Sequence, residues 1–197
     1  MKNIVGQTAR GIDFYPRNTI IKKIYRRLES GNHLYLAAPR RSGKTSIMRA
    51  LEDNPQEGFL FSFVNVEDCL HVEDYFRLLS EELEKIGVDG QFALLGEKAK
   101  RVFSIFLEKV KKIKILSIEI ETTQTTAKPS YAEAFEELLL KLDSEKVTIV
   151  VMVDEFPVAV ENIAKEHGNT AALGFLHANR GMSQRAGKGI GSSIQAQ

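Results

Sequence analysis

Residues 33–46 read HLYLAAPRRSGKTS, and the organisation of the whole chain can be understood from this stretch. Its pattern predicts a short buried strand, a tight turn and the beginning of a helix. The turn fits A-x-x-x-x-G-K-T, which differs at one residue from the phosphate-binding loop G-x-x-x-x-G-K-[ST]. In such a loop the backbone N–H groups and the positive end of the helix dipole face the phosphates. We therefore predict a polyphosphate site made by Ala38, Pro39, Arg40, Arg41, Ser42, Gly43, Lys44, Thr45 and Ser46.

Three residues of this loop have separate chemical tasks. Gly43 lets the backbone approach the phosphates without a Cβ in the way. Lys44 is expected to reach the β- and γ-phosphates, and the Thr45 hydroxyl to bind Mg²⁺. Ala38 stands where the pattern has its first glycine. Either Ala38 is strained there by about 1–2 kcal/mol because the position needs a positive φ, or it ends the strand in the β region; we favour the second interpretation.

A second stretch, residues 147–157, reads VTIVVMVDEFP and ends an apolar strand in two carboxylates. A strand this hydrophobic is typical of the centre of a parallel sheet. Two acidic residues at its end would be costly to bury without a cation beside them. We predict that Asp154 binds Mg²⁺ and that Glu155 orients and deprotonates an attacking water. The alternative is that Glu155 only caps the helix expected at about 158–166.

The composition excludes several classes of protein. Among 197 residues, 27 Lys and Arg balance 26 Asp and Glu, so no overall charge favours nucleic acid or membrane. The single cysteine, Cys69, rules out an internal disulfide and is interpreted as a partly buried residue rather than a nucleophile. No apolar leader and no run long enough to cross a bilayer are found, so a cytoplasmic location is expected.

Apolar periodicity predicts an α/β fold. Helices are expected at 19–28, after Thr45 as far as residue 53, and at 72–86, 92–113, 131–142 and 169–182, with strands at 59–66 and 114–122. Ser130 and Glu133 form the capping box of the helix 131–142. The stretch 97–114 holds seven basic and two acidic residues; we interpret it as a solvated helix face rather than a groove for nucleic acid.

Together with the run Asp13-Phe14-Tyr15-x-Arg17, the two motifs resemble those of prokaryotic AAA-related P-loop ATPases of the archaeal-ATPase and STAND groups. The resemblance implies an ASCE-type P-loop fold, a three-layer αβα sandwich with a mostly parallel sheet in the strand order 5-1-4-3-2. It implies ATP and Mg²⁺ as ligands, and hydrolysis coupled to a conformational or assembly switch. It also implies that Phe14, Tyr15 and Arg17 lie on the adenine side, although the two aromatic residues could equally be ordinary core.

The chain departs from this family after residue 186. Residues 187–197 are rich in glycine and predict a flexible tail instead of the family's fourth strand. We therefore expect one ATPase domain over 1–186, with a helix-plus-strand insertion at about 92–128, a sheet incomplete at its C-terminal strands, and a chain truncated relative to the family. Impaired hydrolysis would follow. The alternatives are a non-catalytic interaction module whose helices 92–113 and 131–142 bind a protein partner or a second copy of the chain, and a nucleic-acid-coupled ATPase.

Overall fold

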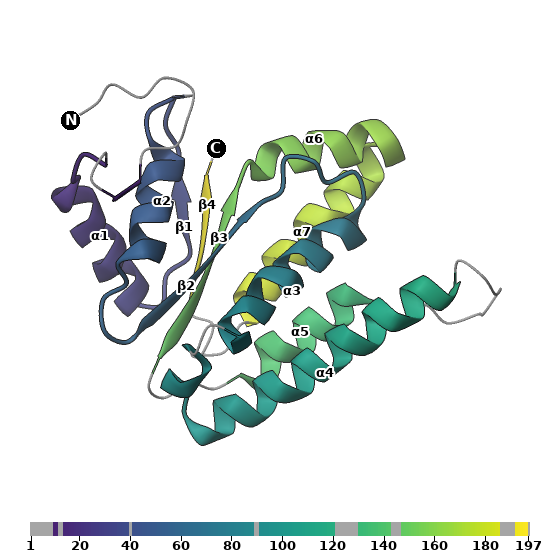
Figure 1. Ribbon diagram of the computed structural model, residues 1–197. Helices are drawn as coiled ribbons and strands as arrows, with labels where there is room; N and C mark the ends of the chain where they lie inside the picture. Colours follow the sequence, from purple (N-terminus) through teal and green to yellow (C-terminus); the bar gives the residue numbers. More distant parts are fainter. Residues whose placement is uncertain are drawn as a thin grey trace.

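A four-stranded parallel sheet forms the centre of the protein (Figure 1). The computed structural model describes residues 10–11, 14–39, 41–88, 91–120, 130–142, 147–185 and 192–196. The strands are β1 (Leu34–Leu36), β2 (Phe59–Asn65), β3 (Thr148–Asp154) and β4 (Ser192–Ala196), and their order across the sheet is β1-β4-β3-β2. Every neighbouring pair is parallel, so the carboxyl ends of all four strands lie at one edge of the sheet.

Helices fill most of the remaining chain. They are α1 (Asn18–Glu29), α2 (Lys44–Asp53), α3 (Val72–Val88), the short 3-10 helix η2 (Gln91–Leu94), α4 (Glu97–Ile120), α5 (Tyr131–Lys141), α6 (Phe156–His167) and α7 (Asn169–Arg185). The helices predicted from periodicity are present within a few residues of their expected ends, except that the helix predicted at 92–113 is divided into η2 and a longer α4 that ends at Ile120. Among the described residues, no helix combines the length and the apolar character needed to cross a membrane.

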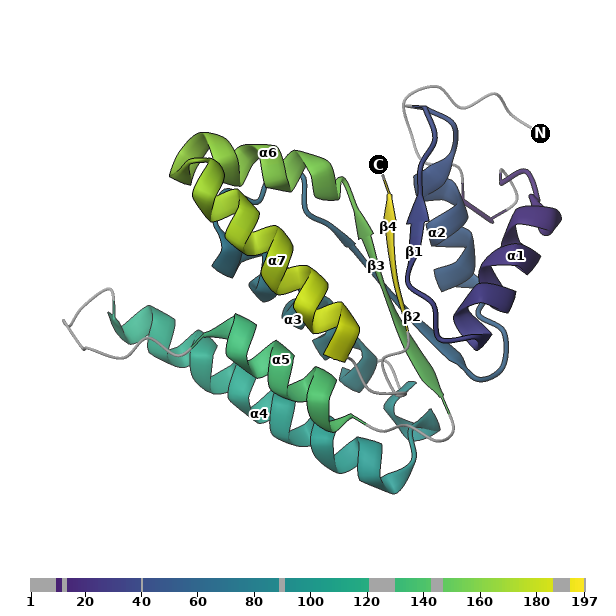
Figure 2. The same ribbon diagram turned by 180° about the vertical axis from the view of Figure 1, so that it is seen from behind.

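The sheet has a separate core on each face. Alternate residues of a strand point to opposite faces, and Phe61 and Phe63 of β2 pack with α1 and α2 while Leu60 and Val64 join the core that holds α3 to α7. Figures 1 and 2 show α1 and α2 on one side of the sheet and the other helices on the opposite side. The continuous apolar character of β2 and β3 is explained by this burial on both faces.

The strand β4 corrects two predictions, the flexible tail over 187–197 and the sheet without its fourth strand. Ser192–Ala196 lies between β1 and β3, with Ile194 in register with both Leu34 and Met152. The glycines on which the prediction relied all precede this strand, and the strand itself contains none. A strand paired on both edges is held by backbone hydrogen bonds, so a weakly apolar sequence can occupy the position. Residues 187–191 lie outside the described part of the chain.

The strand predicted at 114–122 is also wrong over its described part, because α4 continues to Ile120. The alternation of Ile118 and Ile120 with acidic residues suggested a strand. The helical spacing of the buried Phe106, Val110 and Ile113 in the preceding turns prevails instead. The described part of the segment predicted at about 92–128 as a helix plus a strand is thus helical, η2 followed by α4, and α4 packs on α5. Residues 121–129 are outside the described chain.

Candidate functional site

The loop between β1 and α2 contains two residues with left-handed backbone, Arg41 and Gly43. Gly43 is the N-cap of α2 and has a φ of 86°, the left-handed region that glycine adopts without strain. Arg41 also has a positive φ, 62°, which costs energy for a residue with a Cβ. Ala38 is not among the described residues with positive φ, so the interpretation that it simply follows the strand is the correct one. Arg40 lies outside the described residues.

The donors of this loop have few partners within the protein. The backbone N–H groups of residues 43–46 donate to no described residue, as expected for the first turn of a helix. The Lys44 ammonium donates to the backbone carbonyls of Ala38 (2.8 Å) and Pro39 (3.2 Å), which closes the loop over itself. The Ser42 hydroxyl is buried without a hydrogen-bond partner among the described residues. Such unsatisfied donors would suit an anion with many acceptor oxygens.

The two sequence motifs meet at Thr45 and Asp154. The Thr45 hydroxyl donates a 2.6 Å hydrogen bond to Oδ2 of Asp154, across 109 residues of sequence. Asp154 ends β3 with only 3% of its surface exposed, and its Oδ1 accepts the backbone N–H of Glu155 at 3.1 Å. Among the described residues, no Lys, Arg or His forms an ion pair with this carboxylate. A buried carboxylate that accepts hydrogen bonds only from two neutral donors would be stabilised by a cation bound beside it.

Glu155 follows Asp154 in a strained conformation. Its φ of 58° is left-handed, and although the residue occupies the N-cap position of α6, its side chain makes no capping hydrogen bond. Glu155 is thus the N-cap residue of α6, as the alternative had it, and its backbone carbonyl accepts the N–H groups of Val158 (3.0 Å) and Ala159 (3.2 Å), but its side chain takes no part in the cap. Strained backbone of this kind is concentrated at functional sites. Its carboxylate forms no ion pair within the described chain.

Sequence reasoning overlooked Asn65, which stands beside Asp154 in register at the end of β2. The Asn65 side chain is exposed there, and its Oδ1 accepts the backbone N–H of Glu67 at 2.8 Å. A polar residue that ends a strand otherwise buried on both faces is a signal that could have identified it. It adds a polar group to the same edge of the sheet.

The residues before α1 divide between two roles. Phe14 is partly buried and packs against the core under α1 and α2, whereas Tyr15 is 66% exposed and is not core. Arg17 turns toward the loop, and its Nη2 lies 3.2 Å from the point where a Cβ on Gly43 would be. Of the two aromatic residues, Tyr15 is therefore the one whose ring is exposed. Asp13 lies outside the described residues.

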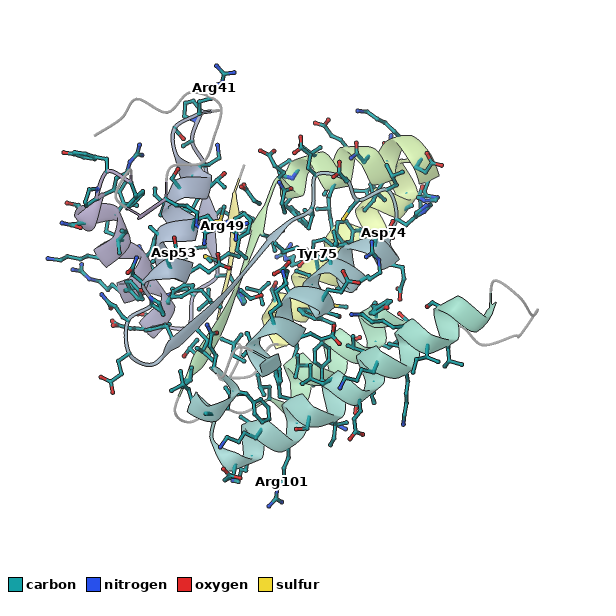
Figure 3. The ribbon with its side chains drawn as sticks, viewed as in Figure 1. Arg41, Arg49, Asp53, Asp74, Tyr75 and Arg101 are labelled. Carbon is teal, nitrogen blue, oxygen red and sulfur yellow. The ribbon has the colours of Figure 1, made fainter. Side chains whose placement is uncertain are left out.

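Two other sequence candidates lie away from this edge of the sheet. Three of the seven basic residues of 97–114 are paired with carboxylates, Lys100 with Glu97, Lys109 with Glu137 and Lys114 with Glu84. Figure 3 shows Arg101 pointing outward at the far end of the molecule from Arg41, which marks the phosphate loop. Cys69 is buried, and burial, with the nearby charge of Asp74, raises the pKa of its thiol to about 11. Such a thiol is a poor nucleophile.

Two comparisons of the sequence with known proteins were negative. A scan against protein-family models gives no match, and a search of curated protein sequences gives none. The assignment of a function therefore rests on the geometry of the site and on the residues that form it.

Proposed function

We propose that the chain is an ATP-binding P-loop protein that hydrolyses ATP to ADP and phosphate with Mg²⁺, in the manner of the AAA-related ATPases that its motifs resemble. The observation that carries this proposal is the 2.6 Å contact between Thr45 and Asp154. A hydroxyl after the loop lysine and a carboxylate at the end of a central strand are the pair that holds Mg²⁺ in P-loop proteins. Mg²⁺ is usually bound by only one or two protein oxygens, and its other ligands are water and phosphate oxygens, so the pair Thr45 and Asp154 suits this ion.

The topology supports the proposal independently. The strand order β1-β4-β3-β2 agrees with the 1-4-3-2 part of the order that the resemblance implies. It puts β4 between the strand that leads to Lys44 and the strand that ends in Asp154. Ligands of open parallel sheets bind at the carboxyl ends of the strands. The candidate residues from β1, β2 and β3 all belong to this edge.

Each residue then has one task in the proposed reaction. The N–H groups of residues 43–46 and the ammonium of Lys44 bind the phosphate oxygens, and Lys44 gives up its contacts with the loop carbonyls to do so. Thr45 and Asp154 are the residues that would hold Mg²⁺, which would neutralise charge on the phosphates. The Glu155 carboxylate positions a water and accepts its proton. The energy of this cycle would be coupled to a change of conformation or assembly.

The test is a titration with ATP and Mg²⁺, followed by thermal unfolding. At about 100 times its Kd, a ligand of the folded state stabilises by about 2.7 kcal/mol, a rise of roughly 5–10 °C in Tm for a chain of this size. Lys44→Ala is expected to abolish the shift, and Lys22→Ala, an exposed lysine of α1, to leave it unchanged. Glu155→Gln should bind normally and lose at least about a hundredfold in turnover. Equal ATP affinity in Lys44→Ala and the parent would refute the proposal.

A further inference from the structure

Arg17 lies beside the N-terminus of α2 and forms no ion pair within the part of the chain that the structure describes. It is the N-cap residue of α1, and its backbone carbonyl accepts the N–H groups of Ile20 (2.9 Å) and Ile21 (3.0 Å). The backbone of Arg17 is therefore fixed by the first turn of α1. Its guanidinium lies over Gly43, with Nη2 and Cζ at 3.2 Å and 3.6 Å from the position of a Cβ there.

The arginines near α2 differ in their partners. Arg10 pairs with Asp53 at the end of α2, and Arg49 pairs with Glu52 at 2.7 Å. Arg17 pairs with no carboxylate among the described residues. Both paired arginines lie by the C-terminal half of α2, whereas the Arg17 guanidinium lies at its N-cap, Gly43.

A guanidinium at this end of a helix is electrostatically unfavourable. The N-terminus of a helix carries a partial positive charge, and a cation beside it costs about 0.3–1 kcal/mol. The first turn of α2 contains no acidic residue that could offset this charge. An anion bound over Gly43 would make this charge arrangement favourable, because it would accept from the guanidinium and from the N–H groups of residues 43–46, which donate to no described residue.

We propose that Arg17 is a phosphate-binding residue of the nucleotide site, rather than a residue of its adenine side. This inference rests on the proposed function and makes it more specific. Arg17 would recognise the ligand by the negative charge of its polyphosphate. Because Arg17 is the N-cap residue of α1, phosphates bound to it would link the beginning of α1 to the N-terminus of α2. Gly43 leaves the space through which the guanidinium reaches the phosphates.

The experiment separates phosphate from base by using a ligand that has no base. Displacement of a fluorescent ATP analogue gives the Kd of ATP and the Ki of inorganic triphosphate, each with Mg²⁺. Arg17→Ala is expected to raise both constants by the same factor, about tenfold, as the loss of one charge-assisted hydrogen bond would. Arg17→Lys should recover part of each constant, and Arg26→Ala, an exposed arginine of the same helix, should change neither.

The outcomes distinguish the role of Arg17 from the existence of the nucleotide site. An unchanged Ki of triphosphate in Arg17→Ala would overturn the inference, whether or not the Kd of ATP rises. In that case the loss of binding in Lys44→Ala would still support the nucleotide site. Failure of the wild-type chain to bind either ligand would refute the proposed function and this inference together. Thermal unfolding without ligand checks the fold, and Arg17→Ala should unfold no lower than the wild type because it breaks no ion pair of the described chain.

Discussion

At the scale of single residues, the hydrogen bond between Thr45 and Asp154 should be measurable without any ligand. Thr45→Val removes the hydroxyl but keeps the shape of the side chain, and it leaves a buried carboxylate with one donor fewer. We expect a loss of about 1.5–3 kcal/mol in the free energy of unfolding, the value of a hydrogen bond to a charged group. Thr45→Ser keeps the hydroxyl and should lose much less. Urea unfolding without nucleotide measures both, and equal stability of the two variants would contradict the contact.

The sequence predicted that its two motifs would meet, and the structure places Thr45 against Asp154, but the backbone conformation around them was not predicted. Lys44, Thr45 and Asp154 were recognisable because their spacing and their place after apolar strands are local features. The left-handed backbone of Arg41 and Glu155 was not predictable, because the strain is imposed by the surrounding fold and does not follow from the residue type. The direction of Arg17 was also beyond the sequence, because it depends on how α1 packs against α2.

At the scale of elements, Glu137 joins the helical pair and gives it a pH dependence. Its hydrogen bonds from Lys109 of α4 and Lys141 of α5 lower the pKa of the carboxyl to about 2 from an ordinary 4.5. A lowered pKa stabilises the folded state above the ordinary value, and this contribution is lost as the pH falls toward 2.

The corresponding variant is Glu137→Gln. At pH 7 it should unfold at a lower temperature than the wild type, by a few degrees at most because the ion pairs are partly exposed and screened by solvent. The difference in Tm should shrink as the pH is lowered from 5 toward 2, and also in 1 M salt. Glu108→Gln, an exposed acid of α4 that forms no ion pair in the described chain, is the control. A difference that stays constant with pH would contradict the assignment.

Long amphipathic elements were predictable, and the two errors concern short or ambiguous ones. Ser130 accepts the N–H groups of Ala132 and Glu133, as the capping box predicted for α5. At 114–120, the sequence alternates with a period of two, but these residues follow directly on a helix that is already formed. Extending a helix adds one hydrogen bond per residue and carries no further cost of nucleation. β4 was not predicted because its sequence is only weakly apolar; the strand is held by pairing with β1 on one edge and β3 on the other.

At the scale of the whole molecule, β4 connects the two halves of the site. Within the described chain β1 is bonded to β4 and to no other strand, while β3 pairs with both β4 and β2. The strand that leads to the phosphate loop is thus joined to the strand of Asp154 through β4. Any loss of β4 pairing should separate Lys44 from Asp154 while leaving the core around α3 to α7 largely in place.

Ile194→Pro tests this connection through the backbone alone. Proline removes the N–H of the residue in the middle of β4, and its ring does not fit a strand paired on both edges. We expect a loss of about 3 kcal/mol or more, by analogy with proline inside a helix, and hence a Tm lower by roughly 6 °C or more. Ile194→Val keeps the N–H and should unfold near the wild type. The proline variant should also lose the stabilisation by ATP and Mg²⁺ even at temperatures where circular dichroism shows its helices intact, because the loop and Asp154 would no longer be held at the same edge. A proline variant with wild-type Tm and wild-type ATP affinity would mean that β4 does not hold the sheet together.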